Sequence, residues 1–284
     1  GEQKKLIQSS IRAPKSANWI VQKKQLGTGH AVKQALPFLR ANSQAVVLYG
    51  DGPLVKISTL KKLIFDAAKN NLTLLTFESA NPKGLGRIIR QNNSKVSGII
   101  EEKDASSSEK KIKEVNSGIL ATSTKNLQQW LPKLRNNNAS KEYYLTDIVA
   151  LCSSENKKIK AISLGDTSEL LGANDNQELH NLERTYQKET ALSFLKSGVK
   201  FADINRVDFR GEVSIGKNVF IDINVVLEGK VTIGSDSIIS AGAVIRNSAL
   251  SKKITVEPYS VIENSKIGTN SMIGPFAHIA PGAE

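Results

Sequence analysis

Residues 213–245 read VSIGKN, VFIDIN, VVLEGK, VTIGSD, SIISAG and AVI when they are written in sixes. The third residue of each block is aliphatic, and the first is valine, serine or alanine. The aliphatic series continues to the C-terminal end with nine steps of six residues and two of five, at Ile215, Ile221, Leu227, Ile233, Ile239, Ile245, Leu250, Val256, Ile262, Ile267, Ile273 and Ile279. A helix repeats every 3.6 residues and a strand every two, so neither keeps this period. A triangular parallel β-helix does, because each side uses about six residues. A β-sandwich, whose strands are spaced less regularly, is the alternative.

The preceding part of the chain has a different pattern. Ala45–Tyr49 is a continuous apolar run, which predicts a buried strand of a parallel sheet. Ser58 and Thr59 precede a segment with helical spacing, and Leu72–Phe77 reads as the next strand. This alternation predicts an α/β domain. Residues 177–197 have helical period, with Gly198 suited to the left-handed position after a helix end. We therefore expect a nucleotide-binding type of domain at 1–176, a linker helix and connection at 177–206, and the β-helix at 207–284.

Composition narrows the classes of partner. The formal net charge is +12, but the lysines are scattered and no aromatic residues interleave with them as a stacking platform for nucleic acid requires. We therefore expect no nucleic-acid partner. No apolar run reaches the length of a membrane span, and the first ten residues lack the apolar stretch of a signal peptide. Cys152 is the single cysteine, which favours a reducing compartment. We expect a cytoplasmic protein with no membrane partner.

Two segments carry candidate chemistry. In residues 22–31, QKKQLGTGHA, the glycines could bring backbone N–H groups close to a base or a phosphate. Asp51 follows the carboxyl end of the predicted strand, which is where α/β sheets bind ligands, and a carboxylate there suits Mg²⁺ with a bound phosphate. An Asx-turn or helix cap before Pro53 explains Asp51 equally well.

Seven segments together resemble one family, the bifunctional N-acetylglucosamine-1-phosphate uridyltransferase / glucosamine-1-phosphate N-acetyltransferase. They are QLGTGHA (25–31), YGDGPL (49–54), GLGRIIR (84–90), IIEEKDA (99–105), EVNSGIL (114–120), NNNASKEYYLTDI (136–148) and GANDNQEL (172–179). The hexapeptide series follows where that family has its own. The resemblance implies a Rossmann-like nucleotidyltransferase domain with a mostly parallel sheet, a linker helix and a left-handed parallel β-helix.

The resemblance also implies an activity and its partners. UMP passes from UTP to N-acetylglucosamine-1-phosphate, giving UDP-N-acetylglucosamine and pyrophosphate, with Mg²⁺ as cofactor. The family is homotrimeric, and its second activity uses acetyl-CoA and glucosamine-1-phosphate. Carried onto this sequence, the uridine contacts are Gln22, Gly27 and Thr28. The sugar contacts are Gly86, Glu101 and Asn116. The remaining nucleotide-sugar and metal residues are Tyr49, Gly50, Asp51 and Asn174, of which Asp51 and Asn174 hold the metal.

The sequence departs from that family in two respects. Nothing in it matches the Gly-rich triphosphate loop with which the family begins, and most acetyltransferase residues lie in later coils than this sequence contains. Ala280 stands where the family has an arginine of the acetyltransferase site. The sequence therefore predicts no turnover by this chain alone. The alternatives are another sugar-1-phosphate nucleotidyltransferase, for adenylyl or guanylyl transfer, and a non-catalytic trimerising module.

Overall fold

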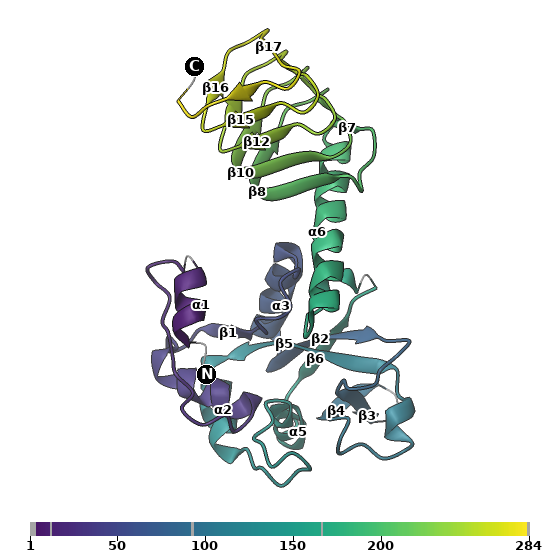
Figure 1. The fold of residues 1–284 in the computed structure, drawn as a ribbon. Helices are drawn as coiled ribbons and strands as arrows, with labels where there is room; N and C mark the ends of the chain where they lie inside the picture. Colours follow the sequence, from purple (N-terminus) through teal and green to yellow (C-terminus); the bar gives the residue numbers. More distant parts are fainter. Residues whose placement is uncertain (1–3, 12, 92–93, 166, 283–284) are drawn as a thin grey trace. The chain divides into compact units, whose positions relative to one another are not determined.

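The computed structural model describes residues 4–11, 13–91, 94–165 and 167–282, and the chain divides into two compact units, residues 1–172 and 173–284. The first unit contains a six-stranded sheet and helices on both of its faces (Figure 1). Its strands are β1 (Gln44–Val47), β2 (Leu72–Glu78), β3 (Arg87–Gln91), β4 (Lys95–Ile100), β5 (Glu114–Ser123) and β6 (Ile159–Ser163). Its helices are α1 (Lys4–Ser10), α2 (Thr28–Ala35), α3 (Ile57–Lys69), α4 (Thr124–Trp130) and α5 (Asp147–Ser154), with 3₁₀ turns at Leu36–Phe38, Glu109–Lys111, Leu131–Lys133 and Ser168–Leu170.

The long strand β5 organises the sheet. One edge of β5 pairs with β2, while the other pairs with β1 near one end and with β3 near the other. All these pairings and the β3–β4 hairpin are antiparallel, and the pairing of β2 with β6 is parallel. The predicted α/β class is confirmed, but the sheet is mixed rather than mostly parallel. The reason is that β3, β4 and β5 follow one another without crossover helices, so that neighbouring strands run in opposite directions.

The apolar run at 45–49 differs from its prediction in the same way. β1 ends at Val47, pairs antiparallel with β5 and is only partly buried. Leu48 and Tyr49 lie beyond the strand and are exposed. An unbroken apolar run alone does not distinguish a central strand from one that is paired along one edge.

Two apolar clusters cover opposite faces of the sheet. Successive residues of β2 alternate between them, since Leu74 belongs to the cluster beneath α4 and α5 whereas Leu75 belongs to the cluster beneath α3. Both side chains are fully buried. Cys152 of α5 lies in the first cluster, and burial raises the pKa of its thiol to about 12, so the thiolate that would react is scarce at neutral pH.

The second unit begins with α6 (Asn176–Lys196), as the helical period predicts. Asp175 caps it by accepting a hydrogen bond from the Glu178 N–H at 2.7 Å, and Gly198 after its end has φ +98°. The buried face differs from the predicted one, because Leu182, Gln187 and Ala191 are buried whereas Leu179 and Tyr186 are exposed. The Gln187 side chain bonds both the N–H and the carbonyl of Phe209, at 2.7 and 3.0 Å, and so takes the place of a neighbouring strand.

A parallel β-solenoid of about four turns follows α6, which confirms the prediction from the six-residue period (Figure 1). Its strands are β7 (Lys200–Phe201), β8 (Val207–Ile215), β9 (Phe220–Ile221), β10 (Val225–Ile233), β11 (Ile238–Ile239), β12 (Val244–Arg246), β13 (Ala249–Leu250), β14 (Thr255–Val256), β15 (Val261–Glu263), β16 (Lys266–Ile267), β17 (Met272–Ile273) and β18 (His278–Ile279). Leu227 pairs with Phe209, 18 residues earlier, whereas Ile245 pairs with Ile262, 17 residues later. The shorter coils contain the five-residue steps of the series.

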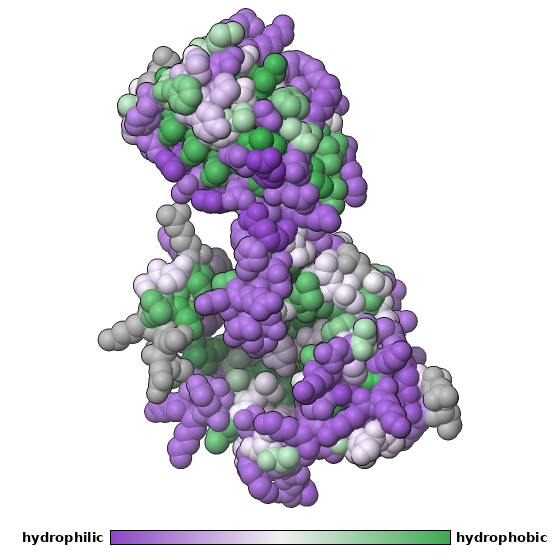
Figure 2. Space-filling model, turned by 45° about the vertical axis from the view of Figure 1, so that its right-hand side comes forward, coloured by the Kyte–Doolittle hydropathy of each residue, from purple (hydrophilic) through white to green (hydrophobic). Residues whose placement is uncertain are grey.

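The solenoid core consists of the aliphatic series itself. Leu227, Ile239 and Ile245 are fully buried, together with the small residues that precede them by two positions. Figure 2 shows hydrophobic side chains among the hydrophilic ones on the visible face of the solenoid. Elsewhere in the described part of the chain, no helix combines the length and the hydropathy that crossing a membrane requires.

One ion cluster makes the first unit sensitive to acid. The Glu155 carboxylate accepts hydrogen bonds from Lys133 at 2.8 Å and from the Trp130 indole at 3.0 Å, and pairs with Lys157 at 2.8 Å. These contacts, that of Lys133 first, lower the pKa of Glu155 to about 2. Because the pKa is lower in the folded state, the stabilisation is present above the ordinary value of 4.5 and is lost as pH falls from about 5 towards 2.

We therefore expect Glu155→Gln to lower the urea midpoint at pH 7 and to have a much smaller effect at pH 3. The exposed carboxylate of Glu78 provides the matched control, and Glu78→Gln should change neither midpoint appreciably. An equal loss of stability by Glu155→Gln at both pH values would show that packing, and not the charge of Glu155, is responsible.

Candidate functional site

The glycine-rich loop that precedes α2 is held against the segment around Tyr143. The Gly29 N–H donates to the Tyr143 carbonyl at 2.8 Å, and the Tyr143 N–H donates to the Leu26 carbonyl at 2.8 Å. Gly27 has φ +104°, and a Cβ there would lie 2.7 Å from the Tyr143 oxygen. Close packing against Tyr143 therefore requires glycine at position 27, whether or not a ligand is also present.

The two polar residues of this loop use only part of their hydrogen-bonding capacity within it. The Gln22 amide nitrogen donates to the Gly27 carbonyl at 3.1 Å and lies 2.9 Å from His30 Nδ1. The amide oxygen of Gln22 makes no hydrogen bond to the described residues. The Thr28 hydroxyl accepts from the Leu145 N–H at 3.0 Å. The structure thus brings Gln22, Gly27 and Thr28 together, with an acceptor remaining on Gln22.

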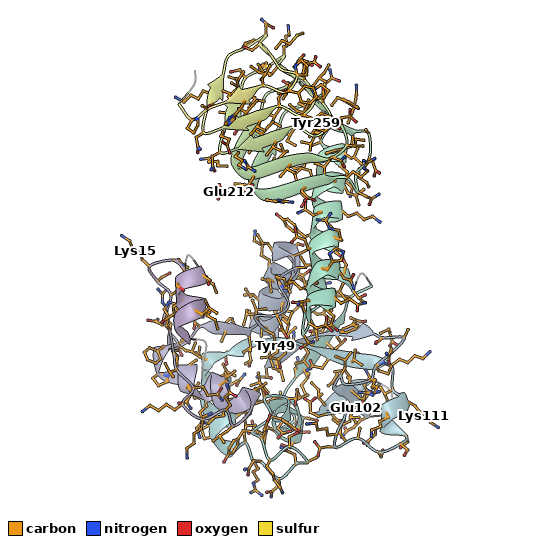
Figure 3. The ribbon with its side chains drawn as sticks, in the orientation of Figure 1. Lys15, Tyr49, Glu102, Lys111, Glu212 and Tyr259 are labelled. Carbon is orange, nitrogen blue, oxygen red and sulfur yellow. The ribbon has the colours of Figure 1, made fainter. Side chains whose placement is uncertain are left out.

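Tyr49 occupies the middle of the first unit (Figure 3). Its ring covers Gly118 of β5, where a Cβ would lie 2.8 Å from the ring Cζ and nearer still to two other ring carbons. Burial raises the pKa of the Tyr49 phenol, and the negative charges of Glu101 and Asp51 raise it further. The phenol is therefore a neutral hydrogen-bonding group at neutral pH, near two of the predicted site residues.

Gly86, Glu101 and Asn116 converge although they lie on three strands or strand ends. The Asn116 N–H donates to the Gly86 carbonyl at 2.8 Å. A Cβ on Gly86 would lie 3.2 Å from Glu101 Oε2 and 2.9 Å from the Ile99 side chain. Only a glycine leaves the Glu101 carboxylate this close to the backbone at position 86.

Thr146 was not among the predicted site residues, although the NNNASKEYYLTDI segment contains it. Its hydroxyl donates to Glu101 Oε1 at 2.8 Å, and only 6% of the residue is exposed. Thr146 therefore holds one oxygen of Glu101, while the other faces Gly86. The signal in the sequence was that this segment matched the family, but the partner of Thr146 lies 45 residues away.

A pocket of about 240 Å³ adjoins Glu101 and is lined by carboxylate, amide and phenol groups. The lining residues are Ile99, Ile100, Glu101, Asp104, Arg135, Asn137, Asn138, Tyr144 and Asp147. The pKa of Asp147 is raised by its burial and then by the charges of Glu101 and Asp104. Neutral and charged oxygen groups around a small cavity suit a ligand rich in hydroxyl groups, such as a sugar.

Asp51 has the properties of a ligand for a hard cation. Its side chain is exposed and makes no hydrogen bond or ion pair with the described residues, and its backbone lies against Gly172. The described residues contain no group of three or more histidine, cysteine, aspartate or glutamate side chains that could hold a metal. Mg²⁺ needs no such group, because it is commonly held by one or two carboxylates together with substrate phosphates. The residues present therefore fit Mg²⁺ bound together with a nucleotide.

Asn174, the second predicted metal ligand, belongs to the second unit. Its backbone N–H and its amide nitrogen both donate to Glu178 Oε2, at 2.7 and 3.2 Å. These bonds orient the amide and use its nitrogen, leaving its oxygen as the group suited to a cation. The pairing of Asn174 with Asp51 stays a prediction.

Comparison with known proteins identifies relatives of both units. The family described as the GMPPB C-terminal domain matches residues 209–283. The "Bifunctional protein GlmU" of Nitrosococcus oceani is 50% identical over 210 residues, which make up 74% of this chain and 46% of the relative. The protein of the same name from Baumannia cicadellinicola is 49% identical over 211 residues, covering 74% and 45%. That of Marinobacter nauticus is 45% identical over 213 residues, covering 75% and 47%. The chain spans about half the length of the curated relatives it matches.

Proposed function

Since the chain belongs to the family of the bifunctional GlmU proteins, we propose that its first unit recognises UDP-N-acetylglucosamine and carries the site for uridyl transfer. The reaction joins UTP and N-acetylglucosamine-1-phosphate and releases pyrophosphate. The observation that carries the proposal is the convergence of Gly86, Glu101 and Asn116 beside the Tyr49 ring. The same geometry does not by itself distinguish uridyl transfer from transfer of another nucleotide.

Each group has a role in binding and alignment. Glu101 and the backbone at Gly86 and Asn116 bind sugar hydroxyl and acetamido groups, while Gln22, Gly27 and Thr28 line the uracil pocket. Tyr49 and Gly50 contact the nucleotide-sugar. Asp51 and Asn174 hold Mg²⁺, which supplies charge neutralisation at the phosphates when it is bound.

The chemistry is an in-line displacement. A phosphate oxygen of N-acetylglucosamine-1-phosphate attacks the α-phosphorus of UTP, the bond from that phosphorus to the bridging oxygen breaks, and pyrophosphate leaves with the electron pair. The sugar contacts contribute by holding the attacking phosphate in line. The protein needs no general base, because the attacking oxygen is already anionic.

Selective binding tests the proposal. Isothermal titration of the chain with UDP-N-acetylglucosamine should give a dissociation constant at least about tenfold below those for UDP-glucose, ADP-glucose and GDP-mannose, because buried polar groups discriminate against ligands that leave them unpaired. Transfer is then followed as pyrophosphate release that requires N-acetylglucosamine-1-phosphate and Mg²⁺. Tighter binding of GDP-mannose, or release of pyrophosphate from GTP in preference to UTP, would overturn the uridine assignment.

The role of Asp51 has its own prediction. If Asp51 is a Mg²⁺ ligand, Asp51→Asn should reduce the enhancement of nucleotide binding by Mg²⁺ at least about tenfold, because metal affinity depends strongly on ligand charge. If it only caps a turn, the variant should lose stability, about 1 kcal/mol at most, and keep its Mg²⁺ dependence. Titrations with UTP in the presence of Mg²⁺ and in excess chelator, alongside thermal unfolding, separate the two outcomes.

We also propose that the protein is a homotrimer assembled through its solenoid. The support is the family and the set of large apolar side chains that the solenoid exposes, namely Ile238, Tyr259, Met272 and Phe276. The rings of Tyr259 and Phe276 stack with centroids 5.6 Å apart. Light scattering at micromolar concentration should give three times the chain mass of 30.8 kDa, and a monomer would contradict the proposal.

A further inference from the structure

Two charged residues each directly follow a proposed sugar contact in the sequence. Arg87 follows Gly86 and opens β3, and Glu102 follows Glu101 just beyond the end of β4. Because β3 and β4 form an antiparallel hairpin in which Arg87 pairs with Ile100, both residues lie at the same end of it. Figure 3 labels Glu102 at this edge of the first unit.

The two side chains join the backbone segments on either side of the sugar contacts. Arg87 forms an ion pair with Glu102 through Nη2, and its Nη1 donates to the Leu85 carbonyl. The same Glu102 oxygen accepts from the Gly84 N–H at 3.3 Å. The loop over residues 84–86 and the turn that begins at Glu101 are therefore fastened to each other on both sides of the Gly86–Glu101 approach. The hydrogen bond from Arg87 is also the chief cause that holds the pKa of Glu102 below its ordinary value, so the pair is ionised at neutral pH.

Stability alone explains this pair poorly. Arg87 is only 1% exposed, and removing a guanidinium from water has a cost that its partner's attraction often fails to offset. Its Nε is buried and has no hydrogen-bond partner among the described residues. Three residues further along β3, Arg90 already forms a two-point ion pair with Glu114, at 2.7 Å in both contacts, without reaching the sugar contacts.

We propose that the Arg87–Glu102 ion pair is a positioning device that fixes the distance between Gly86 and the Glu101 carboxylate and thereby determines recognition of the sugar. The inference rests on the proposed function of the first unit. It assigns to Arg87 and Glu102 no contact with the substrate. Their effect passes through the residues that precede them, and it concerns the sugar and not the uridine part of the ligand.

Binding of two ligands by the chain separates positioning from a general structural role. Glu102→Gln keeps the size of the side chain and removes its charge. It should weaken UDP-N-acetylglucosamine binding about tenfold, because small displacements of a positioned group have effects of at least this order. The dissociation constant for UDP, which lacks the sugar, should stay unchanged. Arg87→Lys, which keeps the charge but not the forked geometry, should shift the same ratio in the same direction.

Glu114→Gln is the matched control, since it removes the charge of the other glutamate paired with an arginine of β3. It should lower the midpoint of thermal unfolding while leaving the ratio of the two dissociation constants at its wild-type value. If Glu102→Gln weakens both ligands equally, or neither, the positioning role is wrong. If Glu102→Gln fails to fold, the same readings on Arg87→Lys serve as the test. If the wild-type chain shows no preference for UDP-N-acetylglucosamine over UDP, the proposed sugar site itself is wrong, and that outcome is distinct from the others.

Discussion

Gly118→Ala is expected to weaken the binding of UDP-N-acetylglucosamine by about 100-fold. Gly118 has φ +80°, where an alanine is strained by roughly 1–2 kcal/mol. The larger effect is steric, since the added methyl group would overlap the Tyr49 ring. The ring must then leave its place beside Glu101 and Asp51, and the surface against which the nucleotide-sugar is proposed to bind changes shape. Isothermal titration measures the loss, and thermal unfolding measures the strain separately.

Gly98→Ala is the matched control for this prediction. Gly98 is also a strand glycine of the first unit, but a Cβ there meets no described atom within 4 Å and its φ is not positive. The substitution should change neither binding nor the unfolding midpoint by much. Wild-type affinity in Gly118→Ala would mean that Tyr49 has no part in the site or can occupy another position without consequence.

Leu227→Ala is expected to destabilise the second unit by about 2–5 kcal/mol, the range for removing a large aliphatic side chain from a packed core. Leu227 is fully buried in β10, between Phe209 on the preceding coil and Ile245 on the next. A solenoid coil is supported only by its neighbours, so the cavity affects the coils on both sides. Hydrogen exchange should therefore increase from β8 to β12 and remain unchanged in the sheet of the first unit.

The exposed Lys230 of the same strand gives the control, because Lys230→Ala removes a solvated side chain and should stay within about 0.5 kcal/mol of wild type. UDP-N-acetylglucosamine binding should survive both substitutions if the sugar and uridine contacts lie in the first unit. Loss of binding in Leu227→Ala at a temperature where the first unit remains folded would place part of the site on the solenoid.

The sequence identified the second unit well because its structure is built from local repeats. Each inward residue in the six-residue series occupies the same position in its own side of the coil, so a pattern along the chain is also a pattern in space. Even the five-residue steps correspond to the coils of 17 residues. The buried face of α6 was less predictable, since Gln187 is buried through its bonds to Phe209, a partner 22 residues away.

In the first unit, the sequence by itself determined the α/β class and, through family resemblance, which segments hold the candidate site. It did not determine that β5 pairs antiparallel with β1, β2 and β3, since an apolar strand carries no record of its partner's direction. Nor did it indicate the bond from Thr146 to Glu101 or the ion pair between Arg87 and Glu102. Only the tertiary structure decided these contacts, because they depend on backbone pairings between segments distant in the chain, which no local pattern of residues encodes.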